Sequence, residues 1–119
     1  MTNKEFAASL EKRTQVFTIL ILHISKDLPD TVEGRAIRHQ LSKSGSSIGA
    51  NYREANRSRS KADFINKIRI CESEASETVY WLNIISSMNW GKPTLIGAGL
   101  NEASEILALF TAISKKLKL

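Results

Sequence analysis

The sequence predicts an all-α protein that folds as one antiparallel, up-and-down four-helix bundle over residues 1–119. Apolar residues recur at helical spacing in four separate segments, and no segment alternates with the period of two that is typical of a strand. The chain has only 2 prolines and 6 glycines, which favours long uninterrupted helices. Its 119 residues, 42% of them hydrophobic, suit a single core and a single domain. Short connections place successive helices side by side, so the four segments predict a bundle.

The first predicted helix begins at a capping box and runs to about Leu28. The Thr2 hydroxyl suits the free amides of the first turn, and Glu5 lies three residues later, where its side chain reaches back. Pro29 disfavours a helical conformation in the residue before it and so ends the helix. The apolar stripe is made of Phe6, Leu10, Phe17, Leu20 and Ile24.

The second predicted helix covers about residues 31–55 and is poor in helix-forming residues in its middle. Four serines and two glycines fall between Ser42 and Ala50, and each interior glycine costs about 1 kcal/mol relative to alanine. Packing must therefore hold this helix. Gly45 and Gly49 leave a flat strip for a close neighbour, which is either inside the bundle or on another subunit.

The third and fourth predicted helices follow a polar connection at residues 56–59. Ser60 and Asp63 resemble a second capping box, and Gly91 and Pro93 end the third helix. The fourth helix starts either at Pro93 or, since Gly97 and Gly99 weaken its first turns, only near residue 101. The predicted core of the four helices is Phe6, Leu10, Phe17, Ile24, Ile37, Leu41, Ile48, Phe64, Ile68, Cys71, Leu82, Ile85, Ile106, Phe110 and Ile113.

Composition disfavours several classes of protein. With one cysteine the chain forms no intramolecular disulfide, and no apolar run approaches the roughly 18 to 20 residues of a membrane span. The first residues lack a signal-peptide pattern. We therefore expect a cytoplasmic protein with no membrane partner.

The residues also give no basis for an enzyme or a bound cofactor. A ferritin-like metal site needs Glu-x-x-His, but Leu20 and Ala36 precede the two histidines, His23 and His39, by three residues. Cys71 falls on the apolar stripe of its helix, where a small core residue is expected rather than a nucleophile. We predict no catalytic residue, no metal site and no cofactor.

Positive charge is concentrated in the middle of the chain. The net charge of the whole chain is +5, yet residues 35–69 hold nine basic residues against two acidic ones. Such a local excess favours an anionic partner such as RNA or another nucleic acid, or a contact with acidic residues of another subunit. The candidate interface residues are Arg53, Arg57, Arg59, Lys61 and Lys67.

A polar corner accompanies these cations where the second helix gives way to the third. Asn51 and Glu54 are three residues apart on one helical face, and Asp63 lies in the first turn of the third helix, where the helix dipole favours it. These three residues either belong to a binding site or tie the corner together by caps and ion pairs.

Several motifs resemble the bacterial four-helix bundle proteins, also called the S23 or 23S rRNA intervening-sequence protein family. The resemblance runs from about Leu28 to Leu82, and the string from Ser47 to Ala55 is its most specific part. Many members have Asn-Ile-Ala-Glu-Gly where this chain has Asn-Tyr-Arg-Glu-Ala at residues 51–55, so the chain resembles a separate branch. The other matching residues are Leu28-Pro29, Gln40-Leu41, Ser44, Arg57-Ser58, Asp63-Phe64, Glu74-Ala75-Ser76-Glu77-Thr78 and Tyr80-Trp81-Leu82.

The resemblance implies a left-handed bundle that assembles with copies of itself, with a ring of five favoured. Some members are encoded within insertions in 23S rRNA genes, and a related basic, pentameric group works with a reverse transcriptase. No enzymatic activity is established for the family, and the link to RNA is an association at the level of the fold.

Two functions from different classes therefore stay open. The first is a homo-oligomer that binds RNA or another nucleic acid through the five basic residues. The second is an oligomeric scaffold that binds a protein partner, with the basic residues used in subunit contacts, for instance against Glu72, Glu74 and Glu77 of a neighbour.

Overall fold

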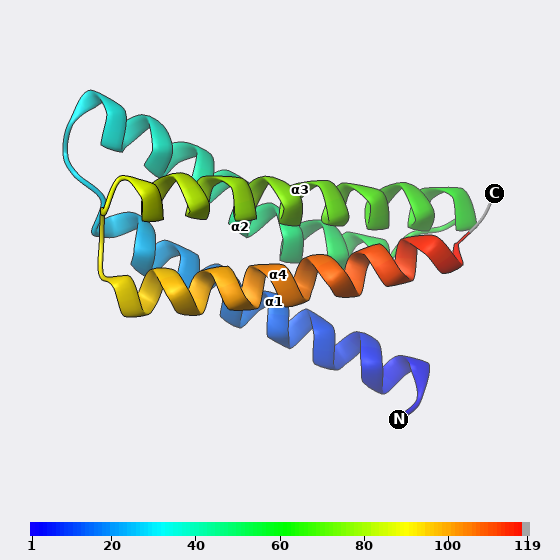
Figure 1. The fold of residues 1–119 in the computed structure, drawn as a ribbon. Coiled ribbons are helices and arrows are strands. Elements are labelled where there is room, and N and C mark those ends of the chain that lie inside the picture. The colour runs from blue at the N-terminus through cyan, green and yellow to red at the C-terminus, as the bar shows by residue number, and fades with distance from the viewer. Residues whose placement is uncertain (118–119) are drawn as a thin grey trace.

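The computed structural model describes residues 1–117 as four antiparallel helices. Helix α1 spans Asn3–Lys26, α2 spans Val32–Ala55, α3 spans Lys61–Ser87 and α4 spans Pro93–Lys116. Each helix packs against its neighbour in sequence, and contacts between α1 and α4 close the bundle. Figure 1 shows α1 leaning away from α4 toward the N-terminus. The predicted up-and-down four-helix bundle is thus confirmed.

Local signals place the helix ends close to their predicted positions. Thr2 and Glu5 form the expected capping box, and the Ser60 hydroxyl accepts a hydrogen bond from the Asp63 amide at 3.0 Å. Thr31 caps α2 in the same way through the Gly34 amide. Of the two starts left open for α4, the structure has Pro93, because proline suits the first turn of a helix.

One core contains side chains from all four helices. Phe17 and Ile21 of α1, Leu41 and Ile48 of α2, and several residues of α3 and α4 are almost fully buried. Tyr52 packs edge-on against Phe110 with 5.4 Å between ring centroids. Eleven residues of the predicted core are buried: Leu10, Phe17, Ile24, Leu41, Ile48, Ile68, Cys71, Leu82, Ile85, Ile106 and Phe110.

The remaining core predictions need correction. Phe6 is 39% exposed, and it lies in the N-terminal part of α1, which diverges from the bundle (Figure 1). Ile37, Phe64 and Ile113 are only half-buried and pack at the margin of the core. Helical spacing gave the correct direction for these side chains but not where the core ends.

The glycine strip of α2 faces α1 within the bundle. A Cβ at Gly45 would lie 2.7 Å from Cγ2 of Ile21, and one at Gly49 would lie 3.2 Å from Oγ1 of Thr14. The neighbour left open by the sequence is therefore a helix of the same chain, and this strip gives no support to a contact with another subunit.

Helix α4 has the length and hydropathy of a membrane-crossing helix. Among the described residues it alone passes this test, with a mean hydropathy of 1.2 in its most apolar window, of which 28% is buried. The same helix supplies Ile106 and Phe110 to the core of the bundle.

Candidate nucleic-acid interface and an adjoining groove

The corner between α2 and α3 is built by local hydrogen bonds. The backbone N–H of Asn56 donates to backbone oxygens in the last turn of α2, and the Ser58 hydroxyl donates to the backbone oxygen of Ala55. Ser60 then caps α3. The corner holds a shallow depression of about 540 Å³, lined by Arg53, Glu54, Arg57, Ser58, Arg59, Ser60, Asp63 and Lys67.

Two of the five predicted basic residues form ion pairs within residues 1–117, and the other three do not. Lys67 pairs with Glu54 at 3.1 Å across α2 and α3, and Arg57 lies 3.7 Å from Glu11 of α1. Arg53, Arg59 and Lys61 are exposed and have no ion pair within residues 1–117. Hereafter these five residues are called the basic corner.

The three residues of the polar corner take part in hydrogen bonds that involve backbone groups and in one ion pair. The Asn51 side-chain amide donates to the backbone oxygen of Ser47 at 2.8 Å, within α2. Glu54 forms an ion pair with Lys67, and the exposed Asp63 lies in the first turn of α3, which Ser60 caps. Of these contacts, only the ion pair between Glu54 and Lys67 joins α2 to α3.

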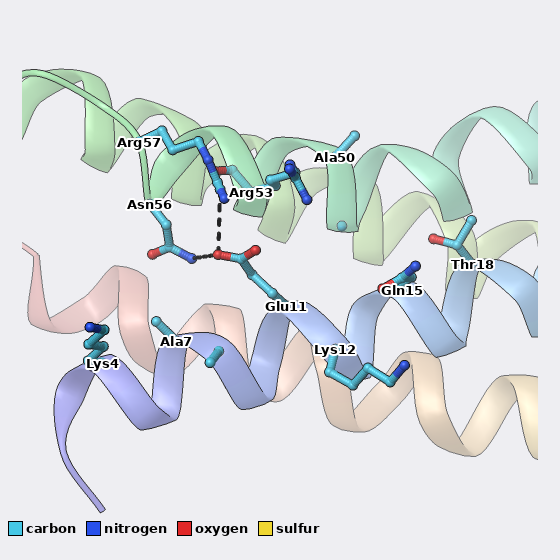
Figure 2. A pocket seen from close by; sticks show the side chains of 12 residues that line it. Lys4, Ala7, Glu11, Lys12, Gln15, Thr18, Ala50, Arg53, Asn56 and Arg57 are labelled. Carbon is cyan, nitrogen blue, oxygen red and sulfur yellow. Dashed lines mark hydrogen bonds and ion pairs between the residues drawn. The ribbon is translucent and has the colours of Figure 1, made fainter.

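A groove between α1 and α2 adjoins the basic corner. It offers about 950 Å³, and Arg53 and Arg57 line both the groove and the corner. In Figure 2, Glu11 points from α1 toward α2, where its carboxylate accepts a hydrogen bond from Asn56 at 2.9 Å and lies near Arg57. The other lining residues are Lys4, Ala7, Ala8, Lys12, Gln15, Thr18, Gly49 and Ala50.

The sequence did not indicate this α1–α2 groove. Lys4 and Lys12 are 49 and 41 residues away from Arg53 along the chain, and only the antiparallel packing of α1 on α2 brings them to one surface. Their spacing of eight residues, with Ala8 midway, is the one available signal, since residues four apart share a helical face.

The acidic residues Glu72, Glu74 and Glu77 lie on α3, and none of them lines the depression at the basic corner. Glu72 and Glu77 line a depression between α3 and α4 with Arg69, Ser73, Ser76, Tyr80 and Leu107. Burial, and then the charge of Glu77, raise the pKa of the Glu74 carboxyl. None of the three forms an ion pair within the described part of the chain.

Cys71 is buried, whereas the two histidines are exposed. Cys71 is fully buried, with its sulfur 3.5 Å from the backbone oxygen of Ile48, and burial raises the pKa of its thiol to about 12. His23 and His39 are exposed on different helices. Across residues 1–117, no group of three or more His, Cys, Asp or Glu side chains is arranged to hold a metal ion.

Comparison with known proteins supports the fold and the family. The model of the 23S rRNA-intervening sequence protein family matches residues 9–112. The chain belongs to this family. The 23S rRNA-intervening sequence proteins include a solved relative, a protein with unknown function from the S23 ribosomal protein family of Bacteroides thetaiotaomicron. It is 33% identical to this chain with a TM-score of 0.82, over 92% of this chain and 97% of its own.

The family assignment confirms the resemblance drawn from the motifs between Leu28 and Leu82 and extends it over most of the chain. No curated protein matches the chain. Membership therefore establishes the fold class and the relatives of this 23S rRNA-intervening sequence protein, and the solved relative is itself described as having unknown function.

Proposed function

We propose that this chain is a non-enzymatic, homo-oligomeric protein of the cytoplasm that binds RNA or another nucleic acid through the basic corner. One observation carries the proposal: Arg53, Arg59 and Lys61 are exposed together without an acidic partner among residues 1–117. Arg53 and Arg59 line one depression, and Lys61 is the next residue after Ser60, which also lines it. Clustered cations attract phosphates, and neutralising phosphates releases counterions. The family's description, which names a 23S rRNA intervening sequence, agrees with an RNA partner.

Contacts of this kind are made to the phosphate backbone. Residues 35–69, which hold the nine basic residues, contain two aromatic residues of the Phe, Tyr and Trp type. Tyr52 is buried and Phe64 is half-buried, so neither offers a free face on which a base can stack. Phosphate contacts position a nucleic acid and carry no direct sequence information. Binding is therefore expected to be weakly selective for sequence and strongly weakened by salt.

The five basic residues contribute unequally to this mechanism. Arg59 and Lys61 flank Ser60, the N-cap of α3. The helix dipole also favours an anion at this N-terminus. Lys67 is already paired with Glu54, and Arg57 is shared with Glu11, so each has less charge to offer a phosphate. Arg53, Arg59 and Lys61, which have no ion pair among residues 1–117, are the residues whose loss weakens binding most.

The decisive experiment is a titration of a structured rRNA fragment and of scrambled RNA of equal length at two salt concentrations. Arg59→Ala/Lys61→Ala is expected to weaken binding to both RNAs alike and to lower the slope of log affinity against log salt by about 2. Lys115→Ala/Lys116→Ala removes the same charge from the exposed end of α4 and is the matched control. Absence of binding at low salt, or a sequence preference that survives high salt, contradicts the mechanism.

A second candidate is an oligomeric scaffold that binds a protein partner. The pairing of Lys67 with Glu54 and of Arg57 with Glu11 favours it only in so far as it leaves fewer free cations for phosphates. Replacing Arg57, Arg59 and Lys61 together with alanine separates the two functions. Loss of RNA affinity in an intact oligomer supports the nucleic-acid function, whereas dissociation of the oligomer places the three residues in a subunit interface.

The number of subunits follows from the family resemblance, which implies a ring of five. Light scattering at micromolar concentration is then expected to give five times the 13.3 kDa of one chain. A mass of one chain at moderate salt contradicts the oligomer.

A further inference from the structure

The α1–α2 groove has cations on both of its walls. Lys4 and Lys12 belong to α1 and Arg53 belongs to α2, and all three side chains are exposed. None of them forms an ion pair within residues 1–117. Lys4 and Lys12 are eight residues apart, which is about 12 Å along a helix that rises 1.5 Å per residue. The positive charge therefore extends along the groove instead of gathering at one point.

Glu11 is the one acidic residue that lines the groove, and its charge is already matched. Its carboxylate accepts a hydrogen bond from the side-chain amide of Asn56 at 2.9 Å and lies 3.7 Å from the guanidinium of Arg57. Figure 2 shows both contacts crossing from α1 to α2. The second distance exceeds the roughly 2.7 to 2.9 Å of a charge-assisted hydrogen bond, and the Arg57 side chain is exposed. An anion in the groove can therefore compete with Glu11 for Arg57.

The lining favours an extended phosphate chain over a segment of a protein partner. Its apolar residues are all small, so they offer no pocket for the large side chains that dominate protein interfaces. Small residues do let a sugar–phosphate backbone approach closely, while lysine and arginine side chains bind its phosphates from both walls. These small residues are Ala7, Ala8, Gly49 and Ala50.

The groove suits a single strand and is too narrow for a duplex. The two helices are in close contact beside it, because a Cβ at Gly49 would lie 3.2 Å from Oγ1 of Thr14. Packed helices lie about 8 to 10 Å apart, whereas the major groove of a DNA duplex alone is about 12 Å wide. A single strand can lay its backbone between the helices with its bases facing solvent. That arrangement needs no aromatic side chain, and the lining contains none.

We propose that the α1–α2 groove binds the phosphate backbone of a single-stranded RNA segment through Lys4, Lys12 and Arg53, and that Glu11 weakens this binding by holding Arg57. The assignment rests on the proposed function and names the form of RNA that this surface takes. Arg53 and Arg57 line both the groove and the depression at the basic corner. A strand that leaves a structured RNA at the corner therefore continues along the groove.

Affinities of the full-length chain for two probes test the groove. One probe is a short oligouridylate, which has no stable secondary structure, and the other is a blunt-ended RNA duplex. Lys4→Ala/Lys12→Ala is expected to lower affinity for the oligouridylate about tenfold and its salt slope by about 1.4, and to change affinity for the duplex by less than about twofold. Lys26→Ala/Lys92→Ala removes two exposed lysines at the opposite end of the bundle and is the matched control.

A substitution at Glu11 tests its opposing role. Glu11→Gln keeps an oxygen that accepts the Asn56 hydrogen bond but removes the negative charge, so Arg57 becomes free for a phosphate. Affinity for the oligouridylate is expected to rise about threefold and the salt slope to steepen by about 0.7. Glu33→Gln removes the same charge from the exposed first turn of α2 and is expected to change neither quantity.

The outcomes separate the groove from the proposed function. Equal losses for both probes, no gain from Glu11→Gln, or a fall in the mass of the oligomer in either variant overturns the single-strand groove. Competition by oligoglutamate as strong as that by unlabelled oligouridylate assigns the groove to an acidic peptide and also overturns it. If Arg59→Ala/Lys61→Ala abolishes binding while the groove variants bind like the wild type, only the groove is refuted. A wild type that binds neither RNA refutes the groove and the proposed function together.

Discussion

At the scale of single residues, buried polar groups set the alignment of α2 against α3. The Thr78 hydroxyl oxygen lies 3.0 Å from the Ser44 hydroxyl and 2.8 Å from the backbone oxygen of Glu74, and both hydroxyl side chains are fully buried. A buried hydroxyl without a partner is costly, so this bond favours one register of the two helices over its alternatives.

Removing the Thr78 hydroxyl is expected to destabilise the fold. Thr78→Val keeps the shape of the side chain and loses the bond to Ser44, so the free energy of unfolding in urea should fall by about 1 to 2 kcal/mol. Thr94→Val is the control, because Thr94 is exposed in the first turn of α4. A double-mutant cycle between Thr78→Val and Ser44→Ala with no coupling energy would count against the role of this bond.

The Cys71 thiol is expected to be inert in the folded protein. Its pKa is raised by burial to about 12 from 9.0, so the folded state keeps the proton longer than the unfolded state does. The stability contributed by this group is therefore present below pH 9.0 and falls as the pH rises from there toward 12. A thiol reagent at pH 8 should label Cys71 slowly in buffer and fast in urea; equal rates would show that the site opens readily.

At the scale of helices, contact distance decides which glycines can be replaced. Gly45 is buried against Ile21, whereas a Cβ at Gly97 of α4 would meet no atom within 4 Å. Both glycines lie inside helices, so both replacements by alanine gain the same intrinsic helix propensity of about 1 kcal/mol. Only packing distinguishes them.

The matched pair Gly45→Ala and Gly97→Ala is expected to change stability in opposite directions. Gly97→Ala should raise the free energy of unfolding by about 0.5 to 1 kcal/mol. Gly45→Ala forces α1 and α2 apart, and overpacking of about 1 to 3 kcal/mol should outweigh the gain in propensity. Thermal melting of both variants measures this, and a rise in melting temperature for Gly45→Ala would contradict the close packing of these helices.

The divergence of α1 from the bundle predicts a gradient of stability along that helix. Phe17→Ala should cost about 3 to 5 kcal/mol, since Phe17 is almost fully buried. Phe6→Ala should cost less than half as much, because the ring is already 39% exposed. Urea denaturation of both variants gives the comparison, and equal losses would mean that the first turns of α1 are covered in solution.

At the scale of the whole molecule, the fold distributes charge over separate faces. The middle of the chain carries nine basic residues against two acidic ones, and the bundle divides these between the basic corner, the α1–α2 groove and ion pairs such as Lys67 with Glu54. A net charge of +5 is thus less informative than the faces on which the unpaired charges lie.

If contacts between exposed charges hold the subunits of the proposed homo-oligomer together, its assembly is expected to weaken with salt. The screening length falls from about 10 Å at 0.1 M to about 3 Å at 1 M, so contacts between exposed charges lose most of their attraction. Light scattering across this range should show the mass declining. A mass that stays constant or rises would indicate that apolar burial, rather than charge, holds the subunits together.

The sequence by itself determined the number of helices, most of their ends and the direction of their apolar faces, but it left the start of α4 open. Periodicity and capping act within a few residues, so Thr2, Ser60 and the spacing from Leu10 to Phe17 suffice to predict them. The family motifs around Ser47 to Ala55 are equally local. For the same reason, Arg53, Arg59 and Lys61 were predictable as a cluster, since they lie at one helix end and the following turn.

Only the tertiary structure decided which distant residues share a surface. The groove between α1 and α2, the pairing of Glu11 with Arg57, and the burial of Gly45 against Ile21 all join segments that are 24 or more residues apart. The exposure of Phe6 was likewise decided by the angle at which α1 leaves the bundle. Helix rotation and crossing angle depend on the sum of many packing contacts, so no local pattern in the sequence specifies them.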